Sequence, residues 1–307
     1  MDKVIDLVVI GAGPAGMTAA LGAKQAGYHV VLLEKSMPGG KLNTYQNFEN
    51  FPGYEHIPPQ NFGLKLYEEL TKIGVESTYG DVTRIEKKND HFLIHLDTGL
   101  IESKAIILAT GTREKPLTIP GSERWLGQGI SYCAACDGIF FKNKDVAVIG
   151  HSRHALEEAV YLANLCHHVY LLMPTKDGSS GQNQVVKLKQ LDNVTLIEQA
   201  TPLALLGDDV VTGIRYQTLT HGEQALMVDG IFPILGWIPN SESIHAFKTL
   251  MDDQGYVIAD ESGVTVIPGL FVIGDLQAKT TRKVKNVIAQ GRLVIQQVKV
   301  FLGVPKS

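Results

Sequence analysis

Short apolar runs alternate with longer amphipathic stretches along this chain. Residues 4–10 and 30–33 are apolar and rich in β-branched side chains, and a helical pattern at about residues 14–26 separates them. Runs of this kind predict parallel strands that are buried on both faces. The same order of strand, helix and strand returns within residues 144–173. The pattern therefore predicts an α/β protein that contains two such units.

The turn after the first predicted strand has the glycine spacing of a dinucleotide-binding unit, G-x-G-x-x-G, and an acidic residue ends the next strand. The first glycine permits a tight turn, the second lets the backbone approach a pyrophosphate, and the third lets the helix pack on the sheet. The acid is placed to bind a ribose hydroxyl. The residues predicted to contact the nucleotide are Gly11, Gly13, Pro14, Ala15, Gly16 and Glu34.

Two later apolar strands end in turns of small residues, at positions 106–111 (I-I-L-A-T-G) and 270–275 (L-F-V-I-G-D). Together with residues 39–42 (G-G-K-L), they resemble the FAD domain of the two-dinucleotide-domain flavoprotein reductases. In that family the aspartate of the Gly-Asp pair, here Asp275, holds the ribityl chain. Residues 47–53 resemble a loop near the flavin, although aromatic packing alone would also explain them. The resemblance implies FAD as cofactor and further contacts from Gly40, Lys41, Leu42, Asn50, Ala109, Thr110, Gly111 and Gly274.

A single C-x-x-C pair, Cys133 and Cys136, lies between these segments, and Asp137 follows it directly. The two-residue spacer lets the sulfurs close a small disulfide, which suits redox exchange. A zinc site would need two more Cys or His ligands at suitable spacing, and the sequence has no second C-x-x-C. The third cysteine, Cys166, falls at the end of a helical pattern and is interpreted as a buried apolar residue. A low, odd count of three favours a reducing cytosol over a disulfide scaffold.

Residues 131–138 (S-Y-C-A-A-C-D-G) closely resemble the active site of the low-molecular-weight thioredoxin reductases. The resemblance covers essentially the whole chain, and residues 236–240 (G-W-I-P-N) match the family's return crossing. It implies that Cys136 exchanges electrons with the flavin, that Cys133 attacks the disulfide of a partner, and that Asp137 gives protons to the thiolates and takes them back.

The resemblance also implies the architecture. We expect two Rossmann-like three-layer dinucleotide-binding domains, the second inserted in the first. Residues 1–114 and 238–307 would form the FAD domain, and residues 115–237 would carry the C-x-x-C. The family is usually homodimeric through its FAD domains, so we expect a homodimer.

The second strand–helix–strand unit keeps its scaffold, with a helix expected at about residues 156–165, but lacks nucleotide-binding residues. Ser152 stands where the pyrophosphate turn needs glycine, and His151 replaces a neighbouring glycine. In NADPH-dependent members the next strand leads into His-Arg-Arg, which holds the 2′-phosphate, whereas residues 173–175 here are M-P-T. No acid ends this strand, which also disfavours NADH. We predict a scaffold for the cysteine pair, while a weak anion site on His151, Arg153 and His154 stays open.

The net charge of −4 is unevenly distributed. No acidic residue follows Asp275, whereas seven basic residues do: Lys279, Arg282, Lys283, Lys285, Arg292, Lys299 and Lys306. They indicate either a solvated helix with cations toward its C-terminus or a docking patch for an acidic partner. The family usually has Arg-Gln-Ala where residues 282–284 read R-K-V, so Arg282, Lys283 and Val284 are predicted flavin contacts. Lys283 departs from the pattern, and would either tune the flavin or join the partner surface.

A branch of the family lacks the NADPH motifs and takes electrons from reduced ferredoxin, and this sequence resembles that branch. We therefore predict an FAD-dependent disulfide oxidoreductase that reduces thioredoxin or a thioredoxin-like protein, with ferredoxin as donor. Two alternatives stay open: the same reductase with weakly bound NAD(P)H, a deazaflavin or a second flavin as donor, and a non-catalytic FAD-binding redox sensor. No signal peptide or membrane span is apparent, so we expect a cytoplasmic protein without membrane, nucleic-acid or metal partners.

Overall fold

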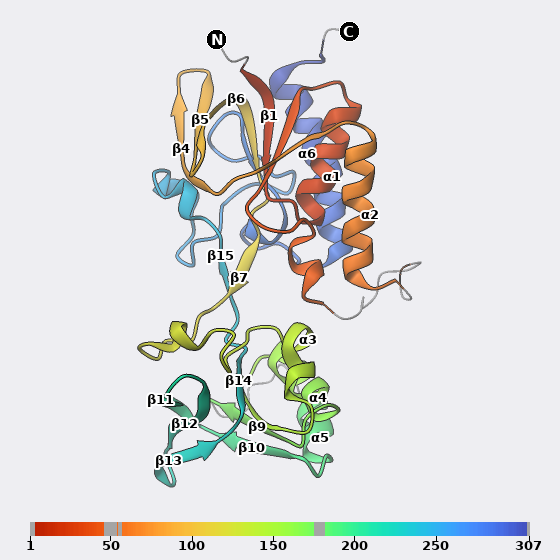
Figure 1. Cartoon of the computed structure of the whole chain (residues 1–307). Helices are drawn as coiled ribbons and strands as arrows, with labels where there is room; N and C mark the ends of the chain where they lie inside the picture. The colour runs from red at the N-terminus through yellow and green to blue at the C-terminus, as the bar shows by residue number, and fades with distance from the viewer. Residues whose placement is uncertain (1–3, 46–53, 55–56, 175–181, 306–307) are drawn as a thin grey trace. The chain divides into compact units, whose positions relative to one another are not determined.

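The computed structural model describes residues 4–45, 54, 57–174 and 182–305. Two predicted residues, Asn50 and Thr175, lie outside the described residues, as does Lys306. The chain divides into two units: Met1–Arg113 with Ile238–Ser307 form unit 1, and Glu114–Trp237 form unit 2 (Figure 1). The chain passes between the units in strands β7 (Thr112–Glu114) and β15 (Trp237–Pro239), which pair as a two-stranded sheet.

A seven-stranded sheet forms the centre of unit 1, in the order β3-β2-β1-β6-β5-β4, with β16 paired to β6. The strands β3, β2, β1, β6 and β16 run parallel, whereas β4 and β5 continue from β6 as an antiparallel meander. Their bounds are β1 Ile5–Ile10, β2 Val30–Glu34, β3 Glu76–Tyr79, β4 Val82–Lys88, β5 His91–Leu96, β6 Gly99–Leu108 and β16 Leu270–Val272.

Both faces of this sheet are buried, which explains the unbroken apolar run of β1. Leu7 and Val9 belong to a core cluster with residues of α1, α2 and α6, which lie together beside the sheet (Figure 1). Val8 and Ile10 point the opposite way, into a second cluster with residues of β5 and of positions 244–276. The helices are α1 Pro14–Gln25, α2 Pro59–Lys72 and α6 Val284–Leu302, with the 3₁₀ turns η1 Gly40–Asn43, η4 Glu242–Ile244, η5 Lys248–Leu250 and η6 Gly274–Leu276.

Unit 2 contains a parallel sheet in the order β10-β9-β8-β14 and an antiparallel sheet in the order β11-β12-β13. Val146 and Val148 of β8 pack toward α4 and α5, whereas Ala147 and Ile149 pack toward the antiparallel sheet. The bounds are α3 Ala134–Asp137, β8 Asp145–Ile149, α4 Arg153–Ala163, β9 His168–Met173, α5 Gln182–Lys189, β10 Val194–Glu198, β11 Thr201–Gly207, β12 Val211–Thr218, β13 Gly222–Met227 and β14 Gly230–Pro233, with the 3₁₀ turns η2 Ser122–Trp125 and η3 Gly138–Phe141.

The predicted α/β class with Rossmann-like units is confirmed. One element begins earlier than expected: α4 starts at Arg153 and not near residue 156, because the Ser152 side chain caps it. Cys166 is buried, as predicted, with 7% of its surface exposed. Among the described residues, no helix has the length and apolar character that crossing a membrane requires.

Candidate active site

The three glycines of the first turn have three different surroundings. Gly11 has φ +105°, and a Cβ there would lie 2.7 Å from the Ala109 carbonyl carbon. A Cβ on Gly16 would collide with the Gly11 carbonyl oxygen, so α1 packs directly on the turn. A Cβ on Gly13 would meet no heavy atom within 4 Å. The first and third glycines thus shape the turn, and the second leaves open space beside the backbone, as the approach of a pyrophosphate requires.

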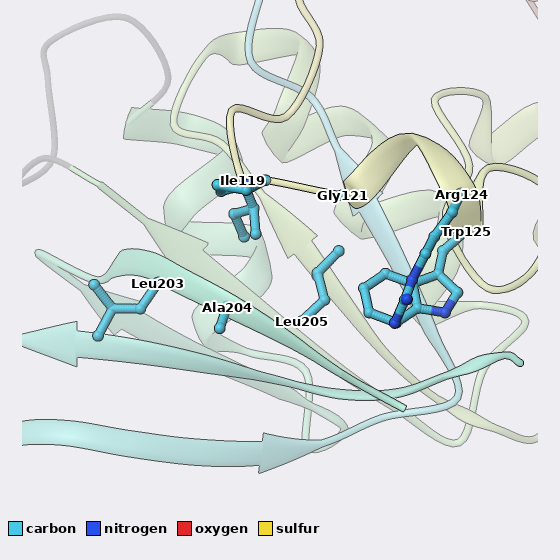
Figure 2. Close-up of a pocket in the computed structure, with 8 residues that line it drawn as sticks. Ile119, Gly121, Arg124, Trp125, Leu203, Ala204 and Leu205 are labelled. Carbon is cyan, nitrogen blue, oxygen red and sulfur yellow. The ribbon is translucent and has the colours of Figure 1, made fainter. Parts of the chain in front are cut away.

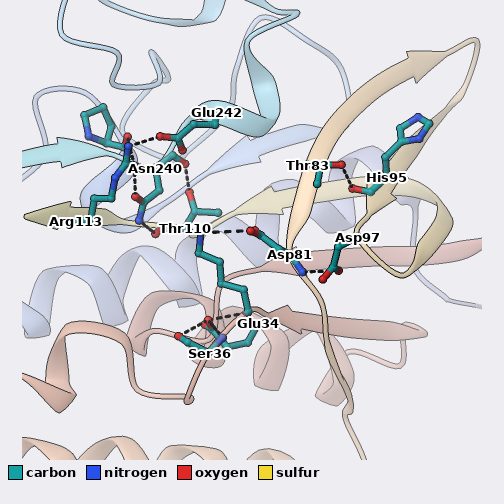
Figure 3. Close-up of polar contacts among 12 residues, drawn as sticks. Glu34, Ser36, Asp81, Thr83, His95, Asp97, Thr110, Arg113, Asn240 and Glu242 are labelled. Atoms are coloured by element: carbon teal, nitrogen blue, oxygen red, sulfur yellow. Dashed lines mark hydrogen bonds and ion pairs between the residues drawn. The ribbon is translucent and has the colours of Figure 1, made fainter. Parts of the chain in front are cut away.

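Glu34 is fixed at the end of β2, beside this turn. Its Oε2 accepts a hydrogen bond from the Ala12 amide at 2.7 Å (distance between N and O). Its Oε1 accepts from the amides of Lys35 and Ser36, and Figure 3 shows Ser36 beside this carboxylate. The Ser36 hydroxyl also donates to Oε1, at 3.1 Å. A carboxylate oxygen has two lone pairs, so Oε2 keeps an acceptor position for a hydroxyl group.

A partly buried ion pair joins two of the predicted FAD segments. Lys41 Nζ lies 2.7 Å from Asp275 Oδ2, and the side chains are 19% and 18% exposed. Gly40, beside Lys41, lies close to the glycine turn, because its Cβ would be 3.2 Å from the Gly13 Cα. Residues 234 positions apart in the sequence are therefore brought to one place. Leu42, another predicted contact, belongs to η1 and is almost fully buried.

The turn after β6 is held by a residue that the sequence did not identify as part of the site. Thr110 Oγ1 donates to the Asn240 carbonyl at 2.6 Å, and the Asn240 side chain donates to the Thr110 carbonyl at 2.8 Å (Figure 3). The Asn240 amide donates to the Gly111 carbonyl. Gln290 of α6 has a similar role, because its Oε1 accepts from the Gly274 amide at 3.0 Å. Both residues position predicted FAD contacts.

These features fit FAD. The chain provides an open glycine turn, a fixed carboxylate with acceptor capacity and a partly buried Lys–Asp pair, all within unit 1. The residues that would hold the pyrophosphate, the ribose and the ribityl chain are Gly13, Glu34 and Asp275, respectively.

We expect Gly13→Ala to lower FAD affinity by roughly tenfold or more while the protein still folds, because the methyl group enters the space predicted for the pyrophosphate. Gly13 has φ −73°, which any residue adopts, and no protein atom opposes the Cβ. The measurements are the flavin-to-protein absorbance ratio and equilibrium dialysis against FAD. Gly16→Ala is the contrast, because its Cβ collides with backbone and should impair folding itself. Unchanged FAD affinity in Gly13→Ala would contradict this assignment.

The basic residues before α6 gather at its N-terminus. Lys283 is the N-cap of the helix, Lys285 lies in its first turn, and no acid occurs in that turn. Arg282 stacks on the Tyr256 ring, 4.4 Å from its centroid. Cations at a helix N-terminus oppose the helix dipole. Among the described basic residues, Lys299 is the one in the last turn of α6, where a cation favours the dipole. Lys279, Arg282, Lys283 and Lys285 are all exposed, so they form a positively charged surface at the start of α6.

The cysteine pair of unit 2 forms a disulfide within one turn of α3. The Cα atoms are 5.3 Å apart, and the Cys136 amide donates to Cys133 Sγ at 3.1 Å. Ser131, a buried residue without a predicted role, connects the disulfide with Asp137. Its Oγ donates to Asp137 Oδ2 at 2.6 Å and accepts from the Cys133 amide at 3.1 Å. The three predicted catalytic residues thus lie together, and Cys136 is exposed in unit 2.

The second glycine turn has a glycine at its first position, Gly150, but a side chain at its second, Ser152. Gly150 has φ +157°, and a Cβ there would collide with the Ile234 carbonyl oxygen, so this glycine shapes the turn as Gly11 does. At the second position, Ser152 Oγ accepts from the Ala155 amide at 3.2 Å and caps α4. Its side chain therefore occupies the helix N-terminus that would otherwise face a phosphate. Met173, where a phosphate-binding residue is expected, is 1% exposed in the core.

The weak anion site considered on His151, Arg153 and His154 gains no support. Arg153 Nε lies 2.6 Å from Glu157 Oε1, so this cation is paired. His154 lies between two carboxylates, with Nε2 4.0 Å from Glu114 and Nδ1 4.0 Å from Glu158.

A pocket of about 370 Å³ lies elsewhere in unit 2, between η2 and β11 (Figure 2). Its walls are mostly apolar, and the Arg124 guanidinium stacks 3.9 Å from the Trp125 ring centroid. It contains none of the predicted site residues, and its lining consists of Ile119, Pro120, Gly121, Arg124, Trp125, Leu203, Ala204 and Leu205.

The dinucleotide site and the redox disulfide define a class of protein. Residues 5–291 match the model of the pyridine nucleotide-disulphide oxidoreductase family, whose cofactor is FAD. The thioredoxin reductase of Mycoplasma genitalium is 33% identical over 301 residues, which cover 97% of this chain and 96% of the relative. The chain belongs to the low-molecular-weight thioredoxin reductases.

Solved structures agree with this assignment. The crystal structure of Lactococcus lactis thioredoxin reductase has a TM-score of 0.89 at 34% identity, with 97% of this chain and 99% of that chain covered. A ferredoxin-flavin thioredoxin reductase from Clostridium acetobutylicum has a TM-score of 0.54 at 25% identity, with 98% of each chain covered. The chain is therefore similar both to a thioredoxin reductase and to a ferredoxin-flavin thioredoxin reductase.

Proposed function

We propose that this protein reduces thioredoxin, or a thioredoxin-like protein, with electrons from a reduced ferredoxin and not from NADPH. One observation carries the choice of donor: the same turn occurs twice in the chain, open at Gly13 and closed by the Ser152 cap. The first turn suits a dinucleotide, whereas the second has a side chain where glycine is needed, and its Ala155 amide already donates to Ser152. The buried Met173 offers no charge to a 2′-phosphate.

The cysteine pair supports the acceptor half of the reaction. When bound, FAD would supply the electron pair that opens the Cys133–Cys136 disulfide. The Cys133 thiolate then attacks one sulfur of the partner disulfide and forms a mixed disulfide, and the other partner sulfur leaves as a thiolate. Cys136 attacks Cys133 in turn, which restores the internal disulfide and releases the partner as a dithiol. Asp137, held by Ser131, is placed to move a proton to a departing thiolate.

Two exposed apolar residues follow this disulfide in the sequence. Ile139 and Phe140, which follow Cys136 within four residues, are 55% and 71% exposed. Exposed large apolar side chains beside a reactive group are typical of a protein-binding surface. They support a protein substrate such as thioredoxin over a small disulfide. We further propose that the protein is cytoplasmic and forms a homodimer through unit 1.

The proposal is tested by an anaerobic turnover assay with reduced ferredoxin as donor and oxidised thioredoxin as acceptor. We expect thioredoxin thiols to appear in proportion to time, with two thiols for every two electrons that ferredoxin delivers. A redox sensor without catalytic activity would release thiols only up to the amount of enzyme. Absence of steady release with ferredoxin would refute the proposed donor, and absence with every donor would refute the reductase.

The positive surface at the start of α6 is the proposed landing site for ferredoxin, because an acidic partner needs opposite charge near the flavin. We expect Lys279→Glu combined with Lys285→Glu to lower kcat/KM for ferredoxin by roughly tenfold at low salt, and the loss to shrink at high salt. Both lysines are exposed, and neither is a predicted FAD contact. Lys299→Glu, at the other end of α6, is the matched control. Equal kinetics of the double variant and the wild type at low salt would exclude this surface.

A further inference from the structure

The strands by which the chain enters and leaves unit 2 meet one group of ionisable side chains. Glu114 ends β7, Trp237 begins β15, and both contact His154 in the first turn of α4. The His154 ring stacks on the Trp237 indole at 5.8 Å between centroids, and its Nε2 lies 4.0 Å from Glu114 Oε1. Its Nδ1 lies 4.0 Å from Glu158 Oε1, one helical turn further along α4. One imidazole therefore connects both crossing strands with α4.

This group is partly shielded from water. The side chains of Glu114 and Glu158 are each 16% exposed, and that of His154 is 28% exposed. Glu158 Oε2 is buried and has no hydrogen-bond partner among the described residues. Burial, together with the negative charge of Glu157, raises the pKa of the Glu158 carboxyl to about 7. Glu157 is itself paired with Arg153.

We propose that Glu114, His154 and Glu158 form a proton-dependent clamp, which fastens both crossing strands to α4 at pH 6 and loosens as the pH rises to 8. With Glu158 protonated, its carboxyl group adds no negative charge beside His154, whose other ring nitrogen faces Glu114. Loss of that proton places a negative charge on the partly buried Glu158 carboxyl group, beside His154. A buried charge without full compensation is costly, and opening of the group to water relieves it.

The sign of the pH dependence follows from the raised pKa. The folded protein keeps a proton on Glu158 between the ordinary carboxyl pKa of 4.5 and about 7, where the unfolded chain has lost it. Protonation therefore favours the closed group at the lower pH, and this advantage disappears as the pH rises through 7. An ordinary buried salt bridge would behave in the opposite way between pH 4 and 7.

Hydrogen exchange of the FAD-loaded protein at pH 6 and pH 8, corrected for the intrinsic exchange rates, tests the clamp. In peptides that cover residues 110–118, 150–160 and 234–240, we expect at least fivefold less protection at pH 8. Glu158→Gln keeps the shape and removes the charge, so its protection should be equal at both pH values. Glu198→Gln, an exposed carboxyl of β10 in the same unit, is the matched control and should behave as the wild type.

Equal corrected protection of the wild type at both pH values would refute the clamp, and so would a pH difference that persists in Glu158→Gln. The wild-type comparison is decisive even where a variant fails to fold. A kinetic consequence rests on the proposed function: the fall in thioredoxin turnover from pH 6 to pH 8 should be smaller in Glu158→Gln. Because the exchange experiment needs neither donor nor acceptor, failure of the clamp is distinguishable from failure of the proposed reductase.

Discussion

Replacement of Cys133 by serine should lower disulfide reduction by roughly a thousandfold or more and leave FAD bound. A serine hydroxyl is not ionised near neutral pH and does not attack a disulfide, whereas a thiolate does. The cysteine pair lies in unit 2, and the predicted FAD contacts lie in unit 1, so cofactor binding should be independent of the substitution. Thiol release from thioredoxin measures the first effect, and the visible absorbance of the flavin measures the second.

Cys136→Ser distinguishes the roles of the two sulfurs. Turnover should stop as well, but the remaining Cys133 thiolate should form a mixed disulfide with thioredoxin that cannot be resolved. Mass spectrometry would detect this adduct, and Cys133→Ser should give none. An adduct formed only through Cys136 would reverse the two roles, and steady turnover without either cysteine would refute the dithiol mechanism. Cys166→Ser is the control, because burial raises the pKa of that thiol to about 11.

The parts of the fold with strong local signals were predicted closely. The run at residues 4–10 corresponds to β1 at Ile5–Ile10, and the helix expected at 14–26 corresponds to α1 at Pro14–Gln25. Both depend on an apolar run beside a glycine turn, and such signals need no knowledge of distant residues. The start of α4 was wrong by three residues, because Ser152 was interpreted only as an obstacle to a ligand. Serine is also a preferred N-cap, and that property decides where the helix begins.

The supporting residues of the site were harder to predict. Asn240, Gln290 and Ser131 hold predicted contacts in place, but each acts through a hydrogen bond that depends on tertiary packing. Asn240 is 130 residues from Thr110 in the sequence, and no spacing rule connects them. The cluster around His154 has the same origin, since β7, α4 and β15 each contribute to it. The sequence shows which residue types are present, whereas the contacts among these residues depend on the tertiary fold.

Reduced ferredoxin, and not NADPH, should bleach the oxidised flavin band under anaerobic conditions. At equal donor concentrations we expect the rates to differ by at least about a hundredfold. Each charge-assisted hydrogen bond to a phosphate contributes about 1.5–3 kcal/mol, so the loss of two such contacts already accounts for this factor. NADH should be as slow as NADPH, because no acid ends β9 to hold its ribose.

Ser152→Gly tests why NADPH is expected to be a slow donor. The substitution removes the cap and reopens the turn, but the buried Met173 still offers no charge to the 2′-phosphate. We therefore expect NADPH to remain slow in this variant, with ferredoxin unaffected. Fast bleaching of the wild type by NADPH would mean that the Ser152 turn opens readily and that the chain is an ordinary NADPH-dependent thioredoxin reductase. Fast bleaching only in Ser152→Gly would show that one side chain blocks a site whose other contacts are intact.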